Sequence, residues 1–164
     1  MRPKQPMIEF SPEAKKRYQT IVSHYPHKRA ALLPVLTLAQ HEFGWISQEV
    51  AEYIGGLMGY PPSDVLSVAT FYTMLHKKPA GKYHLDICKN VSCWLMGVNP
   101  CIDEIKRKLE VERREVTADG KFSWDVTECL GSCGTAPAMQ VGNRYYENLT
   151  PTKIAEIIDT LRQE

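Results

Sequence analysis

Four of the five cysteines in this 164-residue chain lie in two tight pairs, and no other feature constrains the chain as strongly. Cys88 and Cys93 have four residues between them, and Cys129 and Cys133 have three. Four thiolates complete one metal shell, and soft anionic sulfur suits iron-sulfur clusters and zinc. The pairs therefore predict one metal centre that all four cysteines bind.

The spacing within each pair favours a 2Fe-2S cluster over zinc. Structural zinc sites usually contain Cys-x2-Cys, although gaps of up to four residues occur, and neither pair has the short gap. A 2Fe-2S cluster needs two thiolates on each iron, across a wider span than one tetrahedral ion requires. Gly131 and Gly134 let the backbone approach closely, which would aim peptide N–H groups at anionic sulfur.

Two other interpretations of the cysteines remain open: a non-redox scaffold with structural zinc, and disulfides or unligated thiols. Disulfides are the weakest of these, because the cysteine count is odd and residues 1–10 show no secretory or transit pattern. Cys101 is left over. It would lie in the first turn of a helix beginning at Pro100, where an auxiliary ligand is conceivable, but we expect a small buried hydrophobic residue.

The sequence around the pairs resembles a known family. Residues 128–137 read ECLGSCGTAP and follow the Cys-x4-Cys pair by about 35 residues, residues 68–74 read VATFYTM, and residues 145–151 read YYENLTP. Together they resemble the thioredoxin-like 2Fe-2S subunit, the NuoE type, of the NADH dehydrogenase module of respiratory complex I. The resemblance extends over residues 11–161.

This resemblance implies a 2Fe-2S electron-carrier subunit of NADH:quinone oxidoreductase, with Cys88, Cys93, Cys129 and Cys133 as cluster ligands. The cluster would exchange single electrons with FMN. FMN and NADH would be bound by a flavin-containing partner, and other subunits of the module would also be partners, so the chain needs no complete active site of its own. The family also includes subunits of NAD(P)-linked hydrogenases and formate dehydrogenases, so the equivalent diaphorase-module subunit is an alternative.

Charge and hydropathy exclude other classes of partner. The net charge is +1, and the basic runs at 76–78 and 106–108 are short, so nucleic acid is not an expected ligand. No apolar run approaches the roughly 18 residues that span a bilayer, so direct membrane insertion is not expected. We expect a cytoplasmic protein, which the resemblance would place peripherally on the cytoplasmic face of the inner membrane through its complex.

Other catalytic or cofactor motifs are absent from the sequence. The five histidines are not spaced against either cysteine pair, which argues against a Rieske-type site. Gly55-Gly56 and the glycines near Cys133 do not form a dinucleotide-binding fingerprint. The chain is therefore not expected to bind NADH by itself.

The first half of the chain predicts four short amphipathic helices. Their start signals are Ser11-Pro12, Ser47 and Pro61-Pro62, and Gly44 and Gly59 end the second and third. In the second helix Pro34 predicts either a late start or a kink. The apolar stripe Phe71, Tyr72 and Met74 is interpreted as core rather than contact surface.

Polar residues and helix breakers at 77–81 mark a predicted boundary between a helical bundle, 1–78, and a second domain, 79–164. Strand alternation from Tyr83 delivers Cys88 at a strand end, with Cys93 on the following loop. A helix from Asn99-Pro100, a strand at 122–127, a hairpin at 139–146 and a helix after Thr150-Pro151 follow. This order predicts an α+β protein with a thioredoxin-like α/β 2Fe-2S ferredoxin domain after the bundle.

Overall fold

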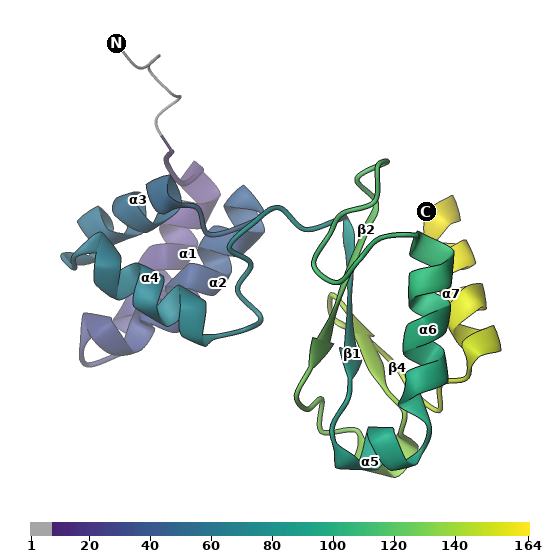
Figure 1. The fold of residues 1–164 in the computed structure, drawn as a ribbon. Coiled ribbons are helices and arrows are strands. Elements are labelled where there is room, and N and C mark those ends of the chain that lie inside the picture. Colours follow the sequence, from purple (N-terminus) through teal and green to yellow (C-terminus); the bar gives the residue numbers. More distant parts are fainter. Residues whose placement is uncertain (1–7) are drawn as a thin grey trace. The chain divides into compact units, whose positions relative to one another are not determined.

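Buried hydrophobic side chains form two separate clusters, one in each half of the chain. The computed structural model describes residues 8–164, and its contacts divide the chain into two units, Met1–Pro79 and Ala80–Glu164 (Figure 1). Most of the segment 1–10, in which no signal sequence is expected, lies outside the described residues. Among residues 8–164 no helix has both the length and the apolar character needed to cross a bilayer.

The first unit is helical. Its elements are α1 (Pro12–Ser23), a short 3-10 turn η1 (Lys28–Ala31), α2 (Leu32–Phe43), α3 (Gln48–Met58) and α4 (Pro62–Phe71). Ser11 and Ser47 cap α1 and α3 by accepting the N–H groups of Ala14 and Val50. The predicted helices and their caps are therefore confirmed.

The second helix begins at Leu32, two residues before Pro34, so the predicted late start is wrong. Pro34 is the third residue of α2, in the first turn, where an N–H group has no partner within the helix. The η1 turn leads into α2 directly. Proline therefore removes no helical hydrogen bond at this position.

The helical core consists of aliphatic side chains together with an aromatic group near its start. Phe10 stacks on Phe43 with ring centroids 5.5 Å apart, and its backbone N–H donates to the Tyr53 hydroxyl at 2.9 Å. Other fully buried members are Val35, Leu36, Ala39, Ile46, Ile54, Val65 and Ala69. The segment before α1 is thus held to α2 and α3.

The predicted burial of the stripe Phe71, Tyr72 and Met74 is wrong for two of its members. Phe71 is 77% exposed and Met74 is 59% exposed. The helix α4 ends at Phe71, and Tyr72 has extended backbone angles. Helical periodicity therefore stops where the stripe was expected to continue.

The second unit is built on a four-stranded sheet in the order β2-β1-β3-β4. The strands are β1 (Tyr83–Cys88), β2 (Phe122–Thr127), β3 (Met139–Val141) and β4 (Arg144–Tyr146). β1 is parallel to β2 and antiparallel to β3, and β3 forms a hairpin with β4. This topology matches the predicted thioredoxin-like α/β domain.

Two helices, α6 (Val98–Leu109) and α7 (Pro151–Gln163), lie side by side against the sheet (Figure 1). They share one core with the strands, whose fully buried members include Leu85, Ile105, Trp124, Ile154 and Ile158. Phe122 and Trp124 are both about 1% exposed. The sheet therefore has a dense apolar layer on its helical side.

A short helix, α5 (Val91–Leu95), was not predicted. Asn90 caps it by accepting the Val91 N–H at 2.7 Å, so Cys93 lies in a helix rather than on a loop. Gly97, with φ +82°, ends this turn and starts α6 at Val98 instead of Pro100. The predicted start is wrong because Pro100 is tolerated inside the first turn, just as Pro34 is.

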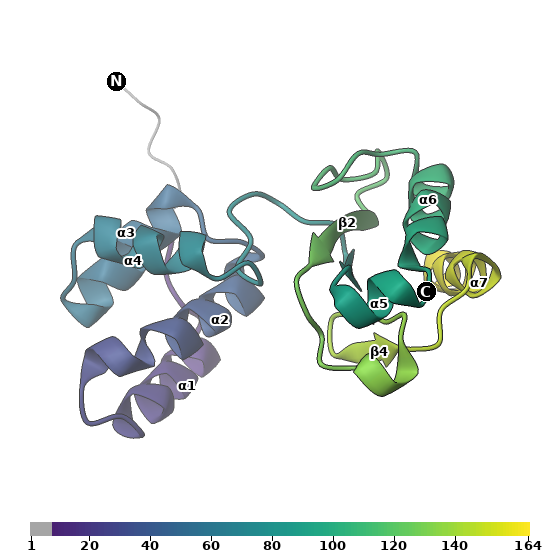
Figure 2. The same cartoon turned by 60° about the horizontal axis from the view of Figure 1, so that its bottom comes forward.

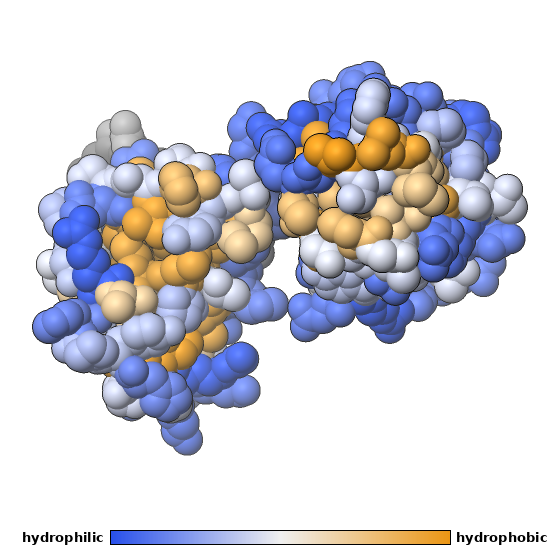
Figure 3. Space-filling model, turned by 90° about the horizontal axis from the view of Figure 1, so that it is seen from below, coloured by the Kyte–Doolittle hydropathy of each residue, from blue (hydrophilic) through white to orange (hydrophobic). Residues whose placement is uncertain are grey.

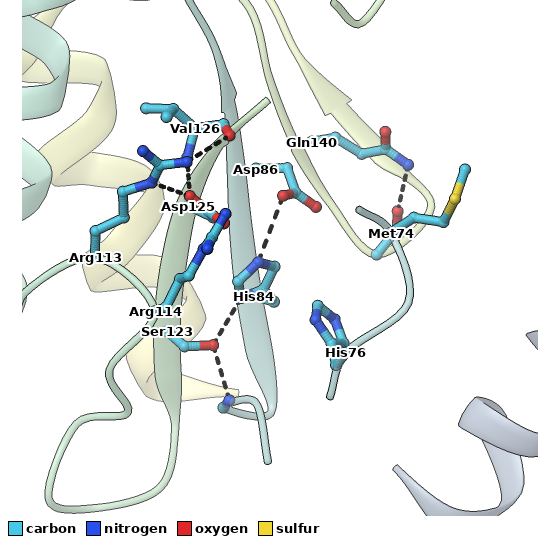
Figure 4. A network of polar contacts seen from close by, with 12 residues as sticks. Met74, His76, His84, Asp86, Arg113, Arg114, Ser123, Asp125, Val126 and Gln140 are labelled. Carbon is cyan, nitrogen blue, oxygen red and sulfur yellow. Dashed lines mark hydrogen bonds and ion pairs between the residues drawn. The ribbon is translucent and has the colours of Figure 1, made fainter. Parts of the chain in front are cut away.

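Polar contacts along β2 hold it to its neighbours (Figure 4). Ser123 accepts the Gly81 N–H at 2.9 Å and lies 2.7 Å from His84 Nδ1 on β1. Asp125 accepts from Arg113 and, at 2.6 Å, from Arg114. Burial alone would raise the pKa of Asp125. The hydrogen bonds from the two guanidinium groups lower it by more, so its pKa lies below the ordinary value. β2 is thus fixed just before the segment that carries Cys129.

Two adjacent glycines of α3 test the packing of the helical unit. A Cβ at Gly55 would lie 2.7 Å from the backbone oxygen of Tyr60, whereas a Cβ at Gly56 would meet nothing within 4 Å. We expect Gly55→Ala to lower the free energy of unfolding by about 1–3 kcal/mol through this clash. Gly56→Ala should raise it by up to about 1 kcal/mol through helix propensity. Urea unfolding of the full chain measures both, and equal effects would contradict the α3–α4 packing.

Candidate metal centre

The four paired cysteines line one cavity of about 160 Å³ in the second unit. Cys88 and Cys93 are buried, and Cys129 and Cys133 are exposed. The cavity lies where the end of β1, the helix α5 and the loop after β2 meet, at the end of the unit that faces forward in Figure 2. The fold thus brings together all four residues singled out in the sequence.

The end of the sheet positions the first pair. Cys88 is the last residue of β1 and is paired in parallel register with Thr127, the last residue of β2. The Cys88 N–H donates to Ala138 O at 3.0 Å, and the Lys89 N–H donates to Thr127 O at 3.1 Å. Both strands therefore end at the same edge, where sites tend to form in α/β folds.

The second pair lies on a loop whose backbone approaches sulfur. Gly131 has φ +73°, a left-handed conformation that glycine adopts without strain, and its N–H donates to Cys129 Sγ at 3.3 Å. Cys133 then begins a short 3-10 turn, η2 (Cys133–Thr135). The expectation that glycine aims a peptide N–H at sulfur is confirmed at Gly131.

Polar side chains that sequence reasoning missed hold this loop. The Glu147 carboxylate accepts from the Ser132 hydroxyl and, at 2.6 Å, from the Thr135 hydroxyl, and the Tyr145 hydroxyl donates to Leu130 O at 3.3 Å. Both hydroxyl bonds hold the pKa of Glu147 below its usual range. Glu147 belongs to the YYENLTP motif, but its sequence position gives no sign of a partner 15 residues away.

Burial alters the protonation of one thiol of the site, Cys93. Burial raises the pKa of Cys93, and the neighbouring Cys88 thiol raises it further, while the Ala138 backbone acts in the opposite direction. Cys93 is therefore protonated at neutral pH in the metal-free chain. Because thiolate is the ligand form, metal binding at this residue must release a proton.

The donor set fits a group bound entirely by thiolates. Within the described chain, the cavity is otherwise lined by Asn90, Val91, Ser92, Gly131 and Ser132. None of these side chains is an imidazole or a carboxylate. Among residues 8–164, the four cysteines included, no three histidine, cysteine or acidic side chains lie close enough together to bind one metal ion.

Cys101 does not line this cavity. It is 1% exposed, in the core between α6 and the sheet, and burial alone raises the pKa of its thiol. A buried neutral thiol behaves as a small hydrophobic side chain. The structure thus supports the prediction that Cys101 is a small buried hydrophobic residue and not a ligand of the site.

A large apolar surface lies beside the cavity. On α5 and the residue after it, Val91, Trp94, Leu95 and Met96 are each more than half exposed. Figure 3 shows apolar side chains gathered on this end of the second unit. Contiguous exposed apolar surface of this kind is typical of an interaction site.

Comparison with known proteins gives the family. The model of the thioredoxin-like [2Fe-2S] ferredoxin family matches residues 18–162, and the chain belongs to this family. Membership implies a 2Fe-2S cluster. The family resemblance and the fold class predicted from the sequence are both confirmed.

Curated relatives give a more particular likeness. Over 149 residues the chain is 43% identical to the NADH-quinone oxidoreductase subunit designated E in Rickettsia bellii (strain RML369-C), covering 89% of each chain. Over 148 residues it is 35% identical to the NADH-quinone oxidoreductase subunit designated E 2 in Rhizobium meliloti (strain 1021), covering 90% of this chain and 88% of the relative. The likeness to these two subunits therefore extends over nearly the whole chain.

A solved structure shares the fold. An NAD+-reducing [NiFe]-hydrogenase in the H2-reduced state aligns over 81% of this chain with a TM-score of 0.71. The chain spans only 22% of that hydrogenase chain, at 20% identity. This likeness therefore shows the fold alone.

Replacing Cys101 tests its assignment to the core. We expect Cys101→Ala to lower the free energy of unfolding by about 1 kcal/mol, because it removes a packed sulfur atom. The metal content of purified protein should not change. Metal analysis and urea unfolding on the same sample measure the two effects, and a clear loss of metal would show that Cys101 is a ligand.

Proposed function

We propose that the chain is the 2Fe-2S electron-carrier subunit of an NADH:quinone oxidoreductase, with Cys88, Cys93, Cys129 and Cys133 as the cluster ligands. The convergence of all four thiols on one cavity carries this proposal. The name of the Rickettsia and Rhizobium relatives, which match nearly the whole chain, supports the choice of complex. When bound, the cluster supplies one-electron redox chemistry.

The four cysteines would give the cluster one buried side and one exposed side. Cys88, at a strand end, and Cys93, in α5, are themselves buried members of the core, so this side is shielded from water. Cys129 and Cys133 are exposed, on the side where electrons can enter or leave. The Gly131 N–H stabilises negative charge on the Cys129 sulfur.

We propose a flavin-containing subunit, which binds FMN and NADH, as the direct partner. Its contact would include the apolar surface of α5, because Trp94 and Leu95 lie one and two residues after Cys93 and are 57% and 69% exposed. Other subunits would cover Phe71 and Met74 on the helical unit. Residues 1–78 and 79–164 would act as separate domains, one for assembly and one for the cluster.

In this proposal the chain contributes no complete active site, since NADH oxidation takes place on the partner. The assembled complex would hold the chain at the cytoplasmic face of the inner membrane. The alternative of a diaphorase-module subunit in an NAD(P)-linked hydrogenase or formate dehydrogenase has a fold likeness in its favour. The curated relatives favour the quinone-reducing complex.

The cluster assignment is tested by metal analysis and EPR of the anaerobically purified chain. We expect two irons per chain and a rhombic S = 1/2 signal on reduction, as a 2Fe-2S cluster requires. Cys88→Ala and Cys129→Ala should each lose most of the iron and the signal, while Cys101→Ala, the matched control, retains both. One zinc per chain and no EPR signal would establish the structural zinc scaffold instead.

The partner surface is tested by binding to the isolated flavin-containing subunit. A buried tryptophan at an interface commonly contributes about 2 kcal/mol or more, so Trp94→Glu should weaken binding at least about thirtyfold. Tyr25→Glu is the control, because Tyr25 is an exposed aromatic residue of the other unit. Unchanged affinity for Trp94→Glu, measured by calorimetry with cluster-loaded protein, would exclude α5 from the interface.

A further inference from the structure

The loop that carries Cys129 and Cys133 has little apolar packing to order it. Both cysteines are exposed, and no residue of η2 is buried. Between Cys129 and Thr135, Leu130 is the one side chain packed against the described hydrophobic core, and it is only partly buried; the buried core resumes at Ala136. Polar contacts must therefore determine the conformation of this half of the site.

Glu147 is at the centre of those contacts. A single carboxylate oxygen, Oε1, accepts from Ser132 and Thr135, and the two hydroxyl oxygens are themselves 2.7 Å apart. These hydroxyl residues flank Cys133, one residue before it and two residues after it. The three side chains, Glu147, Ser132 and Thr135, form a cluster that we name the loop clamp.

The clamp is anchored from the other side by backbone and by α7. The Asn148 N–H donates to Thr135 O at 2.7 Å, and the Leu149 N–H donates to Pro137 O at 3.1 Å. Lys153 Nζ, in the first turn of α7, donates to Glu147 O at 2.6 Å. Leu149 itself is 4% exposed in the core. Glu147 thus links a weakly packed ligand loop to a firmly packed segment.

We propose that Glu147 is a positioning residue of the cluster site, which holds the Cys133 loop through Ser132 and Thr135 and lowers the reduction potential of the bound cluster. This inference rests on the proposed function. Reduction adds negative charge to the cluster, and a carboxylate hydrogen-bonded to the two hydroxyl residues that flank Cys133 disfavours that charge. The hydroxyl bonds that lower the pKa of Glu147 keep it ionised at neutral pH.

Two substitutions separate the charge from the clamp. Glu147→Gln keeps an acceptor oxygen for the hydroxyls but removes the charge, so the midpoint potential at pH 7 should become more positive while the cluster is retained. Glu147→Ala also removes the acceptor. Because hydrogen bonds to an ionised group are stronger than neutral ones, losing both should raise the anaerobic rate of cluster release about tenfold or more.

Glu156→Gln is the matched control, because Glu156 is an exposed glutamate of α7 and its removal makes the same change in net charge. EPR-monitored redox titration of the full chain measures the potentials, and visible absorbance follows cluster release. A positive shift for Glu147→Gln beyond that of Glu156→Gln, with faster release from Glu147→Ala, supports the proposal.

Equal potentials for Glu147→Gln and Glu156→Gln would overturn the electrostatic role, and wild-type release from Glu147→Ala would overturn the clamp. If Glu147→Ala fails to fold, Ser132→Ala with Thr135→Val tests the clamp by the same release assay. Failure of the proposed function is a separate result, because the wild-type chain would then bind no 2Fe-2S cluster.

Discussion

Parallel pairing of β1 with β2 is the interaction on which the rest of the site depends. The two strands run in register from Tyr83 and Phe122 to Cys88 and Thr127, so both end at one edge of the sheet. The first cysteine pair begins at that edge, and Cys129 follows two residues beyond β2. Thiols that are far apart in the chain therefore line one cavity, and the core beneath the strands holds Cys88 and Cys93 there.

The two halves of the site are ordered by different forces. Cys88 and Cys93 belong to the hydrophobic core, where close packing with aliphatic side chains determines their position. Cys129 and Cys133 are held by directional hydrogen bonds from Gly131, within the loop, and through Ser132 and Thr135 to Glu147. Packing makes the buried half of the site rigid. The polar half brings a carboxylate and a peptide N–H group to the ligand loop, and a protein adjusts the reduction potential of a cluster through such charges and hydrogen bonds.

Exposed apolar side chains occur on both units of the described chain. Trp94, Leu95 and Met96 on one unit, and Phe71 and Met74 on the other, are each more than half exposed. One helix, α5, carries a buried thiol on its inner side and apolar residues on its outer side. In the proposed function, a partner that covers α5 would also approach the cavity of the four cysteines, because Cys93 lies in that helix.

The sequence by itself determined what depends on local chemistry: the helices capped at Ser11 and Ser47, the strand ending at Cys88, the cysteine pairs and, through its motifs, the family. These features follow from the preferences of neighbouring residues. Only the tertiary structure decided the exposure of Phe71, the placement of Cys93 in a helix and the contact of Glu147 with the Cys133 loop. Helical periodicity does not show where a helix stops, and a hydrogen bond between distant residues requires the fold that brings them together.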